Sequence, residues 1–188
     1  MKKSVLALVL VLLLALSACC SDGGDEPSNT STAPEVTEPA APPASEAPTS
    51  KYYFADSVLV SEDVRIEITD WRVIPVGEEG NEYGDVPVIA FWYTVTNLSG
   101  SENVTPIGSW IAMFTAIQDN DPNLVNELDV GSLPDDAYLD TQMATVKEGG
   151  TVECAIAYEL DDTTTPVVLR ATRGLFGEDL CEQTFEIA

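Results

Sequence analysis

The sequence predicts an all-β fold, an antiparallel β-sandwich of six to eight short strands, within residues 51–188. Two observations indicate it. Apolar residues recur at every second position in several short segments, as on strands with one buried face. Clusters of Gly, Asp, Asn, Ser and Pro separate these segments, and no segment combines a helical period with capping residues.

The N-terminus has the pattern of a signal peptide. Lys2 and Lys3 precede twelve unbroken apolar residues, 5–16, a stretch shorter than the about 20 residues of a transmembrane helix. The sequence Leu-Ser-Ala-Cys that follows resembles the bacterial lipobox. This resemblance implies that residues 1–18 are a lipoprotein signal peptide and that Cys19 becomes the lipidated first residue of the mature chain. Ordinary secretory cleavage with Cys19 incidental is the alternative, and Cys20 is a second candidate acceptor.

Residues 19–50 are predicted to be the lipidated cysteine followed by a disordered tether. Six prolines lie among Ser, Thr, Ala, Glu and Asp, and Val36 is the only large aliphatic residue. Such a segment cannot offset the entropy lost on ordering. Two acyl chains suffice for stable anchoring. The expected location is therefore the extracellular face of the bacterial cytoplasmic membrane, with the membrane as a partner through the lipid anchor.

Residues 51–188 are predicted to form one β-domain, since every Trp, Tyr and Phe lies there. The clearest strand is 151–160, which alternates between apolar and polar or small residues. In 64–73 the apolar phase shifts by one residue, which predicts a β-bulge near Thr69 and Asp70. The nearly continuous apolar runs 86–95 and 107–117 predict central strands.

The C-terminal part of the domain gives shorter signals. Residues 167–171 and 180–187 are predicted as short strands. Residues 124–139 are predicted as a loop, with a short helix as the alternative, because Gly131 and Pro134 interrupt any helical pattern.

Three segments resemble a known family. They are Tyr-Thr-Val-Thr-Asn at 93–97, the run from Phe114 to Gln118-Asp119, and Glu-Gly-Gly at 148–150 leading into 157–160. They are similar to uncharacterised Gram-positive lipoproteins with an immunoglobulin-like domain of unknown function, related in fold to a secreted mycobacterial immunoprotective antigen. The resemblance covers Tyr52 to the C-terminus and implies an immunoglobulin-like sandwich of about seven strands for residues 51–188. Glu148 departs from it, because Pro is expected there, and the family provides no functional residues to transfer.

Two cysteines lie within the domain. Cys154 is on the apolar face of its strand, and Cys181 shares its phase with Phe185 and Ile187, so both are expected to face inward. A disulfide between them would close a loop of about 28 residues and add roughly 3 kcal/mol. Two buried free thiols are the alternative. Neither is expected to be catalytic, because no His can activate it.

Asp119, Asp121 and Asn123 place oxygen ligands at alternate positions, like the opening of a calcium-binding loop. Leu124 and Val130 stand where an EF-hand needs Gly and Glu. The same residues suit a tight turn, which is the alternative reading.

The charge excludes a nucleic-acid partner. The chain has 32 Asp and Glu against 8 Lys and Arg, a formal net charge of −24, and no His. Part of this charge forms an acidic patch at 78–85, expected to be a solvated loop. The negative field attracts cationic peptides or metal ions, or serves solubility alone.

No nucleophile motif or phosphate-binding loop occurs, so we expect no catalytic residue, no cofactor and no enzyme activity. The sequence favours a non-enzymatic binding or interaction module at the cell surface, with a protein or peptide partner. The alternatives are a structural or accessory envelope protein without its own ligand, and a calcium-dependent adhesion module.

Overall fold

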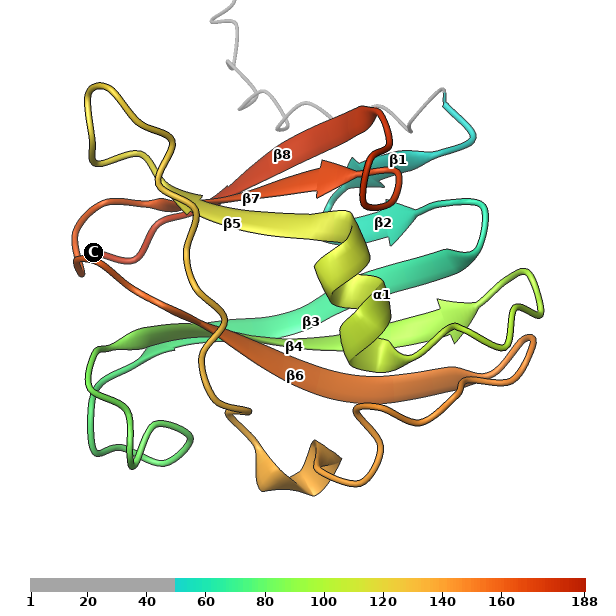
Figure 1. The fold of residues 1–188 in the computed structure, drawn as a ribbon, viewed down its shortest axis with the longest axis horizontal. Coiled ribbons are helices and arrows are strands. Elements are labelled where there is room, and N and C mark those ends of the chain that lie inside the picture. Colours follow the sequence, from blue (N-terminus) through green and yellow to red (C-terminus); the bar gives the residue numbers. More distant parts are fainter. Residues whose placement is uncertain (1–49) are drawn as a thin grey trace, which may run out of the picture. The chain divides into compact units, whose positions relative to one another are not determined.

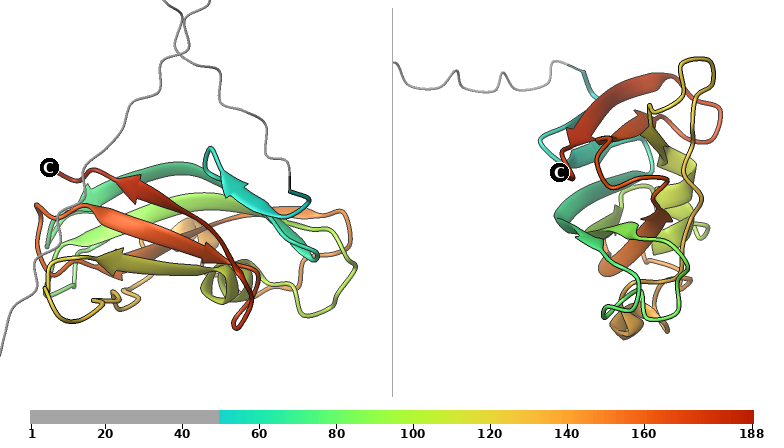
Figure 2. Two further views of the ribbon diagram at one scale, coloured as in Figure 1. Left: turned by 90° about the horizontal axis from the view of Figure 1, so that it is seen from above. Right: turned by 90° about the vertical axis from the view of Figure 1, so that its left-hand side faces the viewer.

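The structure, a computed structural model, describes residues 50–188. Within this range eight strands form two antiparallel sheets (Figure 1). The five-stranded sheet has the order β1-β2-β3-β4-β6 and the three-stranded sheet the order β5-β7-β8, and Figure 2 shows them as two layers. The strands are β1 (Tyr53–Ala55), β2 (Val58–Val60), β3 (Val64–Ile74), β4 (Val88–Asn97), β5 (Phe114–Gln118), β6 (Thr151–Glu159), β7 (Val167–Thr172) and β8 (Asp179–Phe185). The predicted all-β sandwich is confirmed, with eight strands in place of about seven.

The long strands follow the sequence patterns. The alternating segment forms β6, and the run 86–95 forms most of the central strand β4. The predicted bulge is confirmed, because the register between β3 and β4 shifts between Ile68 and Asp70. Before the shift the even-numbered residues of β3 face the core; after it Trp71 and Val73 do. The bulge therefore turns Asp70 and Arg72 to the outer face of the five-stranded sheet.

The hairpin of β1 and β2 was not expected from the sequence. Each strand has three residues, too few for a recognisable alternation. The connecting residues Asp56 and Ser57 have φ angles of 50° and 64°, as in the two-residue turns that match the twist of a hairpin. The Gln183 side chain of β8 accepts a hydrogen bond from the Ser57 amide at 3.1 Å, which ties the hairpin to the other sheet.

The strand predicted at 107–117 is wrong over most of its length. Pro106–Met113 form a helix, α1, and only the following residues continue as β5. Thr105 caps the helix by accepting a hydrogen bond from the Gly108 amide at 3.3 Å, and Pro106 occupies the first turn, where proline is tolerated. The helix crosses from β5 towards β6 and covers the opening between the sheets (Figure 1).

The main core lies between the two sheets and under α1. Its centre is Trp110, fully buried, whose ring lies 4.4 Å from that of Tyr93 and 4.6 Å from that of Phe114. The Trp110 indole donates a 2.9 Å hydrogen bond to the Tyr158 hydroxyl. A second, smaller apolar cluster lies on the outer face of the five-stranded sheet: Ile74, Val88, Ala90 and Ala157, with Trp92 against it.

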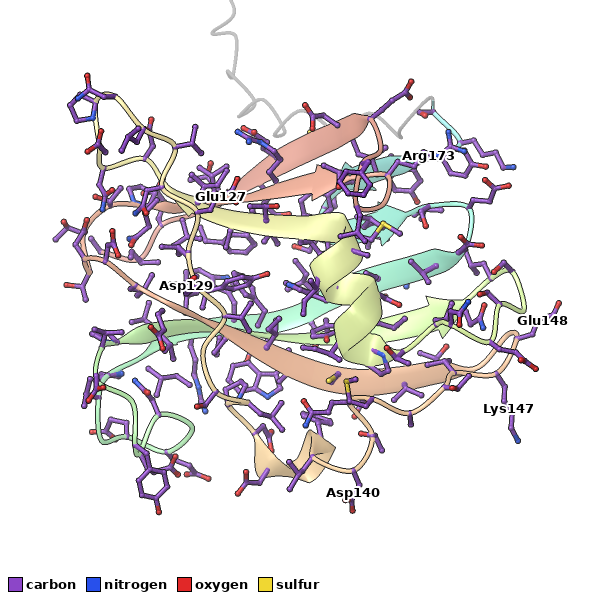
Figure 3. All side chains as sticks on the ribbon, viewed as in Figure 1. Glu127, Asp129, Asp140, Lys147, Glu148 and Arg173 are labelled. Atoms are coloured by element: carbon purple, nitrogen blue, oxygen red, sulfur yellow. The ribbon has the colours of Figure 1, made fainter. Side chains whose placement is uncertain are left out.

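The region predicted as a loop at 124–139 is a loop that ends in a single 3-10 turn, η1 (Asp136–Tyr138). Part of it, residues 126–131, crosses from one sheet to the other; Figure 3 labels Glu127 and Asp129 on this crossing segment. It bonds to β5 through the Gln118 amide and the Asn126 carbonyl, and to β6 through the Glu159 amide and the Asp129 carbonyl.

Strands β7 and β8 form near their predicted positions. Across residues 50–188 we find no helix with the length and apolar character needed to cross a membrane.

Candidate functional site

A hollow with a volume of about 420 Å³ lies on the outer face of the five-stranded sheet. It is lined by Thr69, Asp70, Arg72, Trp92, Tyr93, Asp135, Tyr138, Glu153 and Cys154. We call it the Trp92 groove and define it by the side chains of Arg72, Trp92, Asp135, Tyr138 and Glu153. Three strands and the 3-10 turn contribute to it.

The floor of the groove is an aromatic ring covered by a cation. The Arg72 guanidinium lies 4.7 Å from the centre of the Trp92 ring, within the range of a cation–π interaction. The register explains the contact, because Arg72 pairs with Ala90 and Asp70 with Trp92 on adjacent strands. Had the bulge been absent, Arg72 would point into the core.

Asp135 connects the floor to the wall. One carboxylate oxygen accepts a 3.2 Å hydrogen bond from the Trp92 indole, and the other accepts a 3.0 Å bond from the Ala137 amide at the start of η1. The Trp92 ring is therefore held in orientation, and a carboxylate is fixed at its edge.

Tyr138 and Glu153 complete the wall. Partial burial raises the pKa of the Tyr138 phenol, and the carboxylates of Glu153 and Asp135 raise it further. The phenol therefore stays neutral over the physiological range, because the two carboxylates disfavour a third anion beside them.

Two smaller hollows extend the groove past Arg72 and increase its acidic character. They have volumes of about 190 and 330 Å³, and both include Arg72 and Glu79. Their other acidic residues are Glu78, Glu82, Asp135 and Asp136. The predicted acidic patch at 78–85 thus forms one rim of this surface and is held close to the opposite loop, since a Cβ at Gly80 would lie 2.5 Å from the Pro134 carbonyl oxygen.

The chemistry of the groove suits a cation. An aromatic face with a fixed carboxylate at its edge attracts ammonium and guanidinium groups. The groove has no thiol or imidazole available as a nucleophile or base: the chain contains no His, and the Cys154 side chain faces the core, where burial raises its thiol pKa.

The cysteine prediction is corrected in one respect. Cys154 is buried on β6, but Cys181 is exposed on β8, and both are free thiols. Cys181 pairs with the buried residue Ala171 and shares its phase with Phe185, as predicted, but the register shifts directly beyond this pair and Leu180 packs against the core. The side chain of Cys181 is therefore exposed, although its face of the strand was predicted correctly, and the two sulfurs are not bridged.

The calcium candidates form a turn. One carboxylate oxygen of Asp121 accepts hydrogen bonds from the amides of Asn123 and Leu124 at 2.7 and 2.9 Å, as expected for the turn alternative. Asp119 is exposed in the same loop. Within residues 50–188 no group of three or more His, Cys, Asp or Glu side chains is arranged to hold a metal ion.

Cys19, Cys20 and the predicted signal peptide and tether, except Ser50, lie outside the described residues. The groove itself was not predicted. Only Glu153 and Arg72 carried a signal, because the alternation of 151–160 and the phase shift within 64–73 place them on the outer face. Asp135 and Tyr138 belong to a loop without regular pattern, and Trp92 is hidden in an apolar run.

The fold matches a solved structure, that of a proposed lipoprotein from Staphylococcus aureus subsp. aureus NCTC 8325. The TM-score is 0.60 at 19% sequence identity, over 72% of this chain and 92% of that chain. A search of curated protein sequences finds no match. The family described as a domain of unknown function, DUF5067, matches residues 39–173, most of the chain. The chain therefore belongs to the DUF5067 family.

Proposed function

We propose that the chain is an extracellular lipoprotein, anchored to the bacterial cytoplasmic membrane through Cys19, whose β-sandwich is a non-enzymatic module that binds a cationic peptide in the Trp92 groove. The lipobox-like sequence supports the anchor, as does the similarity in fold to a staphylococcal protein described as a lipoprotein. The immunoglobulin-like character of the domain and its relation to the mycobacterial antigen belong to the same proposal and are supported by the two-sheet architecture.

One observation carries the binding proposal: the Arg72 guanidinium already lies on the Trp92 ring at 4.7 Å, beside the carboxylate that fixes the ring. The groove thus accommodates a guanidinium group of the chain itself. An Arg or Lys side chain of a partner would meet the same aromatic face and the same carboxylates.

Long-range charge acts in the same direction. Two of the eight basic residues and six of the 32 acidic ones precede residue 51, which leaves a formal charge of −20 on residues 51–188. Such a field accelerates the approach of cationic partners and repels anionic polymers.

The test of binding is a titration of the full chain with triarginine amide, followed by calorimetry at two salt concentrations. We expect saturable binding that weakens with salt. Asp135→Asn should weaken it severalfold, because the variant loses a charge beside the ring. Asp140→Asn is the matched control: it removes the same charge from an exposed position just after η1 (Figure 3). Equal effects of the two variants would contradict a site at the groove and favour an accessory protein that attracts cations only through its net charge.

The anchor is tested separately by mass spectrometry of the mature chain. A diacylglyceryl group on Cys19 is the expected result, and an unmodified secreted chain would contradict it. Turnover of any substrate by the purified chain would contradict the non-enzymatic part.

A further inference from the structure

The turn between β7 and β8, residues 173–178, presents two apolar side chains to solvent. Leu175 is 68% exposed and Phe176 is 102% exposed. The turn is nevertheless ordered by hydrogen bonds, from the Arg173 amide to the Glu178 carbonyl at 2.9 Å and from the Gly177 amide to the Gly174 carbonyl at 3.0 Å. A fixed turn that keeps adjacent Leu and Phe side chains in water indicates an interaction surface.

Aromatic and cationic side chains surround this turn. The Arg173 guanidinium lies 4.1 Å from the centre of the Tyr52 ring, and the Lys51 amine lies 5.1 Å from the same ring. Figure 3 labels Arg173 at this end of the domain. Residues 51–188 contain only six basic residues, so two of them beside one apolar turn are a local concentration. Tyr with Lys or Arg next to exposed apolar residues is typical of surfaces at a membrane interface.

The first described residue lies at the same end of the domain. Ser50, the first described residue, accepts a 3.3 Å hydrogen bond from the Tyr52 amide through its side chain. Cys19 precedes Ser50 by 31 residues, which span at most roughly 100 Å when extended. A linker of this length gives the domain an effective concentration at the membrane in the millimolar range. A weak contact with the membrane would then be populated.

We propose that the turn between β7 and β8 contacts the lipid bilayer, with Phe176 and Leu175 in the boundary between headgroups and acyl chains and with Lys51 and Arg173 at the phosphates. This inference rests on the proposed lipid anchor. It does not depend on the Trp92 groove.

Acidic residues near the turn weaken its affinity for the membrane. Glu62 pairs with Arg173 at 3.3 Å, and Glu178 and Asp179 follow the apolar residues in sequence. They oppose the approach to anionic lipid, so the contact is reversible and depends on the tether. The docked domain would be held with this end against the membrane.

The test uses the mature full-length chain in phosphatidylcholine vesicles that contain brominated lipid, which quenches tryptophan within the bilayer. Phe176→Trp places the probe at the turn. Leu124→Trp is the matched control, because Leu124 is 70% exposed and its loop follows β5 at the opposite end of the three-stranded sheet. The native tryptophans are the same in both variants.

With a millimolar contact and a millimolar effective concentration, the turn is docked about half of the time. The fluorescence contributed by Trp at position 176 should therefore fall about twofold on bromination of the lipid, whereas the Leu124→Trp variant should respond as the unsubstituted chain does. Equal quenching of the two variants in chains that float with the vesicles would overturn the contact and leave the anchor intact. Chains that do not float would overturn the anchor and the tethered contact together.

Discussion

Replacing Arg72 by Ala should strengthen the binding of a cationic ligand, although the replacement removes a side chain that lines the groove. The guanidinium lies 4.7 Å from the centre of the Trp92 ring and competes for the face that the ligand would use. The Arg72→Ala variant exposes this face and adds one net negative charge to the groove.

The size of the effect follows from the distance. A cation–π interaction at an exposed site contributes about 0.5–1 kcal/mol. In the variant the ligand would no longer have to break this interaction before it binds the ring. Repulsion between two unit charges about 5 Å apart in water is about 0.8 kcal/mol, and physiological salt reduces it to roughly half. Together these give about 1–1.5 kcal/mol, or roughly fivefold to tenfold tighter binding.

The assay is calorimetric titration with triarginine amide in about 0.15 M salt. Arg65→Ala provides the control. Arg65 is also on β3, where it pairs with the carboxylate of Glu67 at 2.6 Å, and its replacement makes the same change in net charge away from Trp92. We expect little change for this variant. Unchanged or weaker binding by Arg72→Ala, or an equal gain in both variants, would refute the role of the Trp92 face.

The remaining predictions concern the fold. Cys181 should react with a maleimide reagent in the native protein and Cys154 only after unfolding, as mass spectrometry of the labelled chain would show; equal rates would contradict the difference in exposure between the two thiols. Gln118→Met should lower the free energy of unfolding in urea by about 2–4 kcal/mol, because the fully buried amide makes four hydrogen bonds to residues 161–165; an unchanged urea midpoint would refute this. The backbone amides that donate to Asp162 lower its pKa strongly, so its contribution to stability is present above the unfolded pKa of about 4 and is lost as the pH falls towards the folded value. Asp162→Asn should therefore reduce the loss of stability between neutral and acid pH in urea unfolding, and an unchanged pH dependence would refute the assignment.

Sequence patterns predicted the elements whose two faces differ. In β6 and β3 one face meets the core and the other meets solvent or small residues, so the period of two is visible, and even the bulge at Asp70 appears as a change of phase. Helix α1 was missed because its sequence is apolar on nearly every side. The signal was present in the spacing of its buried residues and in Thr105 followed by Pro106.

The Trp92 groove could not be predicted in the same way. Arg72, Trp92 and Asp135 come from two strands and a distant loop, and nothing in their local sequence shows that they meet. Their meeting depends on the pairing of β3 with β4 and on the path of the loop before η1, both of which are tertiary features. Composition did predict the sign of the ligand's charge that we propose, because net charge needs no knowledge of the fold.

The crossing segment at 126–131 has a consequence for many copies of this domain on one surface. It supplies hydrogen-bond partners to β5, at the border of one sheet, and to β6, at the border of the other. Unpaired strand borders are where neighbouring molecules join into aggregates. A single loop therefore covers part of both borders and leaves less free strand edge at which neighbouring copies could pair.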